Sequence, residues 1–188
     1  MVTPMPRRAL PGKQRGLTMI ELMVTVVILL VGLMGLAGLQ SRLQQSEMES
    51  YQRAQALILL NDMASRITAN RLNAGDYPTT SPLGSGGNCP AAGSTRQSVD
   101  YNEWCLALQG AAEAIGGSSV GTLIGGRGCV EDLGANTYMV TVAWQGLIPL
   151  EPPPASVSCG INAFNDAGSC AQDRCRRAVT TIVRIAEL

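Results

Sequence analysis

The longest apolar stretch of the chain runs from Leu17 to Leu39, and Glu21 is its only charged residue. As an α-helix this stretch would be about 34 Å long, enough to cross the hydrocarbon core of a bilayer. An ordinary secretory signal has a shorter apolar core followed by a cleavage site of small residues, and this run has no such site. The pattern therefore predicts a transmembrane helix over residues 17–39.

The next segment, Gln40–Leu72, is polar and charged, but its apolar residues recur close to the spacing of one helix face. The face that we expect to be buried consists of Met48, Tyr51, Leu59, Met63 and Ile67. Because the apolar run passes straight into this amphipathic pattern, we expect one continuous helix of more than about 50 residues. It should end near Asn73–Pro78, where Asn, Gly, Asp and Pro gather.

The rest of the chain, residues 73–188, predicts a small head domain with a helix and a sheet. Asp100 and Glu103 have the spacing of a capping box, which predicts a helix from Asp100 to Gly116-Gly117. Strands are predicted over Tyr138–Trp144 and Val179–Ile185, with a short strand or hairpin over Val120–Ile124 and Gly128–Asp132. The expected fold class is α+β, with a long N-terminal helix packed on a small antiparallel sheet.

Charge is unevenly distributed along the chain. Lys+Arg and Asp+Glu both total 14, but residues 1–16 hold four basic residues, three prolines and no acid. A basic flank before an apolar span places that flank in the cytoplasm and the remainder outside. Without residues 1–16 the chain carries 10 basic and 14 acidic residues, a net charge of −4. A net acidic surface does not favour general binding to nucleic acid.

The chain has no histidine. This excludes Ser-His-Asp, Cys-His and HExxH chemistry and removes the commonest zinc ligand of proteins. The serines and aspartates lie in predicted loops without an activating base. We therefore expect no catalytic residue, no cofactor and no metal, and a chain that is not an enzyme.

Six cysteines lie beyond the apolar run: Cys89, Cys105, Cys129, Cys159, Cys170 and Cys175. An even number in an exported chain indicates a disulfide framework, and the alternative is a metal site around Cys170 and Cys175. The sequence does not choose among the fifteen possible pairings. As a working pairing we join Cys89 to Cys105 and Cys129 to one of the three C-terminal cysteines, which should hold the predicted loop Pro149–Cys175 in place.

Two further groups of head residues allow a binding role and a structural one. Arg174, Arg176 and Arg177 form a basic cluster that could contact DNA, or could instead make structural salt bridges or a solvated turn. Trp104 and Trp144 both fall on apolar faces of predicted elements, which favours core packing over a ligand platform.

The most specific motif is the junction Arg15-Gly16-Leu17-Thr18-Met19-Ile20-Glu21-Leu22. A basic leader ends in glycine, the apolar run follows at once, and an acid stands at the fifth position after the glycine. This resembles the signal of type IV prepilins and of type II secretion pseudopilins. The resemblance implies that a prepilin peptidase cuts between Gly16 and Leu17 and that the new N-terminus at Leu17 is methylated. The family usually has Phe at that position, so Leu17 departs from its pattern.

Glu21 is costly to place in an apolar span, by roughly 2.5–3.5 kcal/mol on insertion scales. The resemblance implies that this carboxylate meets the free N-terminal amine of a neighbouring subunit during assembly. The alternative is that Glu21 lies near the helix start and reaches the headgroups. Gly32, Gly35 and Gly38 lie on one side of the span, where they either permit close helix packing or reflect the frequency of glycine in membrane helices.

Segments farther along resemble the PilV family of type IV pilus modification proteins, which are minor pilins. They are Gly32–Gln40, Arg66–Tyr77, Trp104–Gly117, Asn136–Gly146 and Cys175–Ile185. The resemblance implies a subunit of the complex at the pilus tip that primes assembly and supports twitching motility or adhesion. It implies as partners the prepilin peptidase, other minor pilins, the major pilin and a possible tip adhesin. The precursor would span the inner membrane once, with its head in the periplasm, before it reaches a cell-surface pilus.

Two other readings of the same segments stay open. One is a minor pseudopilin of a type II secretion system. The other is a single-span membrane protein that never assembles and is not processed.

Overall fold

The structure is a computed structural model that describes residues 16, 18–110, 114–115, 118–119 and 123–186. The chain divides into two compact units, Met1–Gln44 and Gln45–Leu188, and each is described by itself. Helix α1, Met19–Ala69, contributes to both units. We call the second unit, residues 45–188, the head unit.

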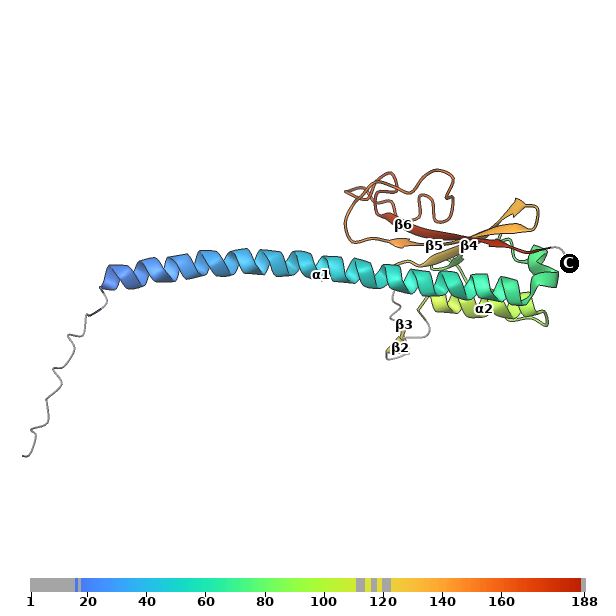
Figure 1. Cartoon of the computed structure of the whole chain (residues 1–188), viewed down its shortest axis with the longest axis horizontal. Helices are drawn as coiled ribbons and strands as arrows, with labels where there is room; N and C mark the ends of the chain where they lie inside the picture. Colours follow the sequence, from blue (N-terminus) through green and yellow to red (C-terminus); the bar gives the residue numbers. More distant parts are fainter. Residues whose placement is uncertain (1–15, 17, 111–113, 116–117, 120–122, 187–188) are drawn as a thin grey trace, which may run out of the picture. The chain divides into compact units, whose positions relative to one another are not determined.

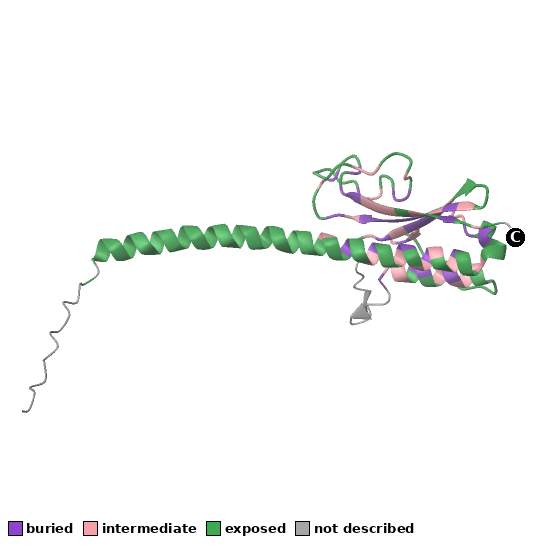
Figure 2. Ribbon diagram, in the orientation of Figure 1, coloured by how far each residue is buried: buried purple, intermediate pink, exposed green. Residues whose placement is uncertain are grey.

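In the first unit, α1 begins immediately after Thr18. The Thr18 hydroxyl accepts a hydrogen bond from the backbone N–H of Glu21 at 3.3 Å, and the Thr18 carbonyl accepts one from Leu22 at 3.2 Å. This is the arrangement of an N-cap residue, which satisfies a backbone donor that the first helical turn leaves free. Every residue of α1 from Met19 to Met48 is exposed, as the uniform green of this part of the helix in Figure 2 shows.

In the head unit, one face of α1 is buried in the core. The buried residues are Gln52, Ala56, Leu60, Met63 and Ile67. The predicted face was right for Met63 and Ile67 but wrong nearer the membrane span, where Met48 and Tyr51 are 50% and 46% exposed. Ala56 and Gln52 are buried instead, so packing between elements overrode the apolar periodicity.

Helix α1 ends at Ala69 and is followed by a 3₁₀ helix, η1, Arg71–Asp76. The second α-helix, α2, spans Arg96–Leu108, and its N-cap is Thr95, whose hydroxyl accepts from the Ser98 N–H. The predicted capping box at Asp100 and Glu103 is therefore wrong. Thr95 already caps the helix, so α2 begins four residues before Asp100. The predicted end at Gly116-Gly117 lies outside the described residues, and α2 itself ends at Leu108.

The main sheet has four antiparallel strands in the order β1-β4-β5-β6 (Figure 1). Its strands are β1, Leu83–Gly84; β4, Arg127–Gly134; β5, Thr137–Gln145; and β6, Arg176–Arg184. A separate pair joins β2, Ala114–Ile115, to β3, Ser118–Ser119. Strands β5 and β6 confirm the two clear sequence predictions. Strand β4 contains the predicted segment Gly128–Asp132, whereas the first residues of Val120–Ile124 lie outside the described residues.

The head core lies between one face of the sheet and the two helices. Tyr138, Val140, Val142 and Trp144 alternate along β5 and pack with the buried residues of α1 and α2. The buried indole of Trp104 donates a hydrogen bond to the Leu59 carbonyl at 2.9 Å. A Cβ atom at Gly128 would lie 2.2 Å from the Trp104 ring, so α2 approaches β4 as closely as glycine allows. The expected α+β fold, a long N-terminal helix packed on an antiparallel sheet, is confirmed.

Candidate functional site

The N-terminal segment carries the processing and assembly residues expected from the sequence. Gly16 is exposed, and nothing lies within 4 Å of a Cβ placed on it. Leu17 and the leader residues 1–15 lie outside the described residues. Glu21 is exposed in the first turn of α1, where a carboxylate interacts favourably with the positive end of the helix dipole. The backbone N–H of Glu21 donates to the Thr18 hydroxyl, which places residue 21 in the first helical turn.

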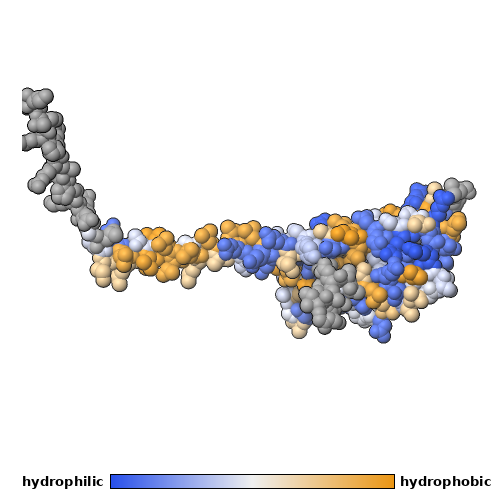
Figure 3. All heavy atoms as spheres, turned by 90° about the horizontal axis from the view of Figure 1, so that it is seen from below, coloured by the Kyte–Doolittle hydropathy of each residue, from blue (hydrophilic) through white to orange (hydrophobic). Residues whose placement is uncertain are grey.

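The exposed surface of this helix is almost entirely apolar. The most apolar stretch has a mean hydropathy of 2.7, and none of its residues is buried. Figure 3 shows the stretch as the orange part of the long helix. By length and composition the helix is able to cross a membrane, and no other helix in the described part of the chain passes that test. The open sides of Gly32, Gly35 and Gly38, with no atom within 4 Å of an added Cβ, leave room for close approach by another helix.

Comparison with known families finds the prokaryotic N-terminal methylation motif over residues 11–37. The matched residues include Gly16, Leu17 and Glu21, together with most of the apolar run. Comparisons with curated proteins and with solved structures found no match. The motif supports a type IV pilin-like protein, either a pilin or a pseudopilin. It suggests a structural subunit rather than an enzyme, one that is anchored in a membrane and processed by a prepilin peptidase.

All six cysteines are joined in disulfides in the structure. The pairs are Cys89–Cys105, Cys129–Cys159 and Cys170–Cys175. Cys89 is thus bonded to Cys105, as in the working pairing, and Cys129 is bonded to Cys159, one of the three C-terminal cysteines. With Cys170 bonded to Cys175, neither sulfur is a free thiolate for the alternative metal site. Within the described residues, no group of three or more His, Cys, Asp or Glu residues is placed to hold a metal ion.

The segment between β5 and β6 packs on the sheet face opposite to α1. Phe164, the only phenylalanine of the chain, forms a second small core with Ala143 and the Cys129–Cys159 disulfide. The guanidinium of Arg127 lies 5.6 Å from the centroid of the Phe164 ring. The long loop predicted at Pro149–Cys175 is therefore a packed layer of the head, held by one disulfide to the sheet and closed by another.

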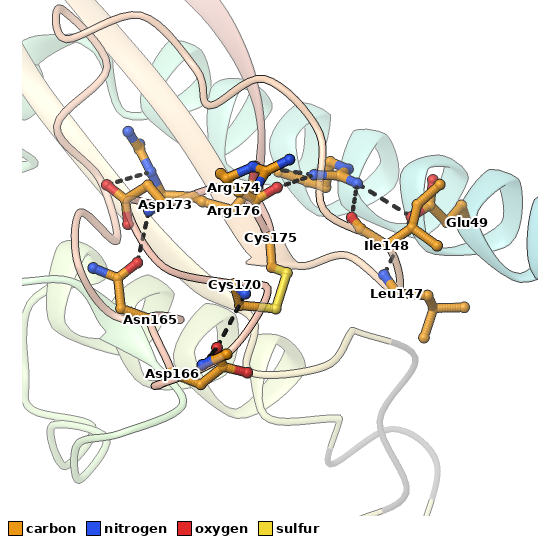
Figure 4. Close-up of a disulfide and its surroundings, with 12 residues drawn as sticks. Glu49, Leu147, Ile148, Asn165, Asp166, Cys170, Asp173, Arg174, Cys175 and Arg176 are labelled. Carbon is orange, nitrogen blue, oxygen red and sulfur yellow. Dashed lines mark hydrogen bonds and ion pairs between the residues drawn. A yellow bond between two sulfur atoms is a disulfide. The ribbon is translucent and has the colours of Figure 1, made fainter.

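The basic cluster beside Cys175 is largely engaged within the protein (Figure 4). Arg176 is buried, pairs with Asp173 at 3.4 Å and donates to the carbonyls of Val157 and Cys159. Arg177 donates to the Ile148 carbonyl at 2.6 Å and pairs with Glu49 of α1 at 3.3 Å. These contacts correspond to the structural alternative considered for the cluster. Trp104 and Trp144 are 0% and 4% exposed, which confirms core packing for both.

A buried polar network, which sequence reasoning missed, joins α1, α2 and Tyr77, the residue that follows η1. The Asp100 carboxylate is fully buried and accepts from Arg66 at 2.9 Å, from Arg96 at 3.1 Å and from the Tyr77 hydroxyl at 2.5 Å. Arg66 also bonds Asp62 and Glu103. No spacing rule signals such a network, because its members lie up to 37 residues apart in the sequence.

The network changes the titration of its members. Burial raises the pKa of Tyr77, and the hydrogen bond to Asp100 raises it further, to about 12. Burial lowers the pKa of Arg66, but its hydrogen bonds to Glu103, Asp100 and Asp62 outweigh this and leave the pKa above its ordinary value. Both effects keep Arg66 charged and the Tyr77 hydroxyl protonated across the neutral range, which suits a structural tie between α1 and α2.

Proposed function

We propose that this chain is a minor pilin of a type IV pilus, made as a membrane-inserted precursor. The observation that carries the proposal is the N-terminal methylation motif over residues 11–37, which runs directly into the 51-residue helix α1. The outer part of that helix is built into the core of the head unit. A chain of this kind can be drawn from the membrane by its helix while its head stays folded.

Four segments have separate tasks in this proposal. Residues 1–16 are the leader that the prepilin peptidase removes by cutting between Gly16 and Leu17, after which Leu17 is N-methylated. Residues 17–39 span the inner membrane, and residues 40–72 hold the amphipathic continuation of the helix, which ends at Ala69. Residues 73–188 form the extracytoplasmic head. The basic leader supports this orientation, and the three disulfides suit an oxidising compartment such as the periplasm.

Glu21 is the assembly residue of the proposal. It is the only charged residue between the start of α1 and Arg42, and its side chain is exposed. A carboxylate in lipid is costly unless it finds a partner, and the free amine at Leu17 of a neighbouring processed subunit is such a partner. Pairing of the two charges would favour movement of the subunit from the bilayer into the filament.

Within the pilins, the resemblance to the PilV family favours a place in the tip complex that primes assembly. The partners would be other minor pilins, the major pilin and a possible tip adhesin. DNA is not a proposed partner, because Arg176 and Arg177 already bind groups of the head itself. A minor pseudopilin of a type II secretion system would carry the same motif and the same processing, so it is the second candidate.

Two measurements test the proposal. The intact mass of protein from cells with an active prepilin peptidase should show loss of residues 1–16 and gain of one methyl group. A mature chain that starts at Met1, or one that is cut after Leu39, contradicts pilin processing. The first result would indicate the unprocessed membrane protein, and the second would indicate removal of the apolar run as a secretory signal. Deletion of the gene should reduce surface filaments and leave type II secretion unchanged. The opposite pattern would identify the pseudopilin.

A further inference from the structure

The two edges of the main sheet differ in whether another segment of the chain covers them. At the β4 edge, β1 pairs with Arg127 and Gly128, and Thr79 exchanges hydrogen bonds with Val130. The segment 79–84 therefore covers the β4 edge from Arg127 to Val130. At the other edge lies β6, nine residues long, and no further strand pairs with it in the part of the chain that the structure describes.

The pairing of β5 with β6 shows which backbone groups of β6 are free. The Gly146 N–H donates to the Cys175 carbonyl, and the Ile185 N–H donates to the Asn136 carbonyl. In an antiparallel pair the direction of the backbone groups alternates, so the odd-numbered residues of β6 bond β5. The N–H and C=O groups of Ala178, Thr180, Ile182 and Arg184 consequently point away from the sheet. Among the described residues, none of these groups has a further hydrogen-bond partner.

This edge lacks the features by which proteins usually block an exposed strand. Such edges are commonly short, bulged, or interrupted by proline or lysine. Strand β6 contains neither residue, and its register against β5 is continuous from Arg176 to Arg184. Thr180 is exposed, and Ile182 is 63% exposed. An open edge of this length, on which Arg184 at the end is the one exposed charged residue, is suited to pairing with another strand.

A groove lies beside the same edge. It has a volume of about 330 Å³ and is lined on one side by Asn61, Ala64, Ser65 and Thr68 of α1 and on the other by Thr181–Arg184 of β6. The α1 side chains that line it are small and uncharged. A strand added to β6 would point every second side chain into this groove, and the remaining side chains would lie beside Ile182 on the opposite face.

We infer that β6 is a strand-addition site that binds an extended segment of a different protein chain. Main-chain hydrogen bonds would supply affinity, and the groove and Ile182 would select alternating side chains. The segment would carry small residues facing α1, apolar residues facing Ile182 and a carboxylate opposite Arg184. Arg184 is exposed and has no ion pair within the described residues.

A second copy of this chain is a poorer occupant of the edge. Antiparallel pairing of two β6 strands over their full length centres on Thr180 and places Arg176 opposite Arg184 at both ends. Like charges directly opposite one another are destabilising, and a shifted register would give up edge hydrogen bonds. The inference rests on the sheet edge alone and does not depend on whether the chain assembles into a pilus.

A synthetic strand peptide tests the site on the full-length chain in detergent micelles. The peptide is as long as β6, alternates Val with Ser, has blocked ends and carries one Glu placed to meet Arg184. Fluorescence anisotropy should show saturable binding, and Arg184→Gln should weaken it several-fold. A peptide N-methylated at every second amide should fail to bind because it lacks the donors for the main-chain pairing. A peptide of the same composition without alternation should bind more weakly, because its apolar and small side chains fall on the wrong faces.

The matched protein variants are Thr180→Pro and Thr180→Val. Proline removes an N–H that β5 does not use, so binding should weaken about tenfold, whereas valine keeps that N–H and should keep binding. If Thr180→Pro unfolds the head, the N-methylated peptide tests the same pairing without altering the protein. The site is overturned if the wild-type protein does not bind the peptide at millimolar concentration. It is also overturned if Thr180→Pro binds the peptide as tightly as the wild type does and the N-methylated peptide binds as tightly as the unmodified one. A dimer in sedimentation that Thr180→Pro dissociates overturns the identity of the occupant.

Discussion

Arg177 of β6 and Glu49 of α1 form an ion pair in which Nη2 lies 3.3 Å from Oε1, although 128 residues separate them in the chain. The same Glu49 oxygen accepts from the Leu147 N–H at 3.2 Å, and Arg177 also donates to the Ile148 carbonyl. Figure 4 shows these contacts meeting where the chain leaves β5. The pair thus ties the start of the loop layer to the outer helix.

Arg177→Met should destabilise the head more than Glu49→Gln does. Removal of Arg177 takes away the donor to the Ile148, Arg174 and Arg176 carbonyls and the counter-ion of Glu49, which should cost about 1–2 kcal/mol. Gln at 49 still offers an accepting oxygen to Leu147 and should cost less than about 1 kcal/mol. Thermal unfolding of both variants and of the double variant in detergent measures this. Equal losses, or strictly additive ones, would show that the two residues do not act together.

Tyr77 should make the head sensitive to alkaline pH. Its pKa in the folded state, about 12, is above the ordinary value of 10, so its contribution is complete below pH 10 and is lost as pH rises from 10 to 12. The shift corresponds to about 2–3 kcal/mol. Tyr77→Phe should lower stability at neutral pH, because Asp100 loses a donor, and should flatten the decline above pH 10. Parallel pH profiles for the wild type and the variant would contradict this role; Tyr51→Phe, on the exposed side of α1, is the control.

The three disulfides should contribute unequally to stability. In the chain-entropy model the stabilisation grows with loop length, and the sequence separations are 30, 16 and 5 residues. Replacing both cysteines by alanine should cost about 3.6 kcal/mol for Cys129–Cys159, about 3 for Cys89–Cys105 and about 2 for Cys170–Cys175. Thermal unfolding of the three double variants gives the order. Non-reducing peptide mapping of exported protein should find these pairs, and several free thiols would refute the framework.

Glu21→Ala should stop assembly without stopping membrane insertion. Loss of the carboxylate makes the span more apolar, so precursor levels and cleavage after Gly16 should stay normal. Sheared surface filaments should contain little of the variant, and total piliation should fall by far more than the share of a minor subunit.

Two further variants separate charge pairing from helix capping at Glu21. Glu21→Gln keeps a side chain that can serve the first turn but has no charge, so it should fail like alanine if charge pairing matters. Thr18→Ala removes the N-cap hydroxyl and should assemble nearly as the wild type does. Normal incorporation of Glu21→Gln would show that the charge of Glu21 is not needed for assembly and that its side chain only reaches the lipid headgroups.

Much of the fold could be predicted from local sequence patterns. The apolar run predicts a helix, and the alternation over β5 and β6 predicts two strands, each from residues that are close together in the sequence. The observed elements match these predictions within a few residues. The buried face of α1 was placed correctly at Met63 and Ile67, where large apolar residues contact the core. It failed at Met48 and Tyr51, because the core there accommodates Ala56 and Gln52, which no hydrophobic periodicity favours.

The polar contacts of the head were beyond sequence reasoning for another reason. Asp100 was interpreted as a helix cap because its spacing to Glu103 is local, whereas its real partners, Arg66 and Tyr77, come from α1 and the chain after η1. The Arg177–Glu49 pair likewise depends on which elements meet in space. By contrast, the methylation motif is a contiguous stretch, so the candidate processing and assembly residues were visible in the sequence alone.

Because both tryptophans are buried in one core, they serve as an intrinsic fluorescence probe of the head unit. Trp104 and Trp144 are the only tryptophans of the chain, both lie within the head unit, and the apolar part of α1 has none. Intrinsic fluorescence therefore reports the folding state of the head alone, even when the full chain is held in detergent or in a bilayer. Because the Trp104 ring lies directly against Gly128 and donates to Leu59, separation of α2 from the sheet should red-shift its emission before the outer helix itself melts.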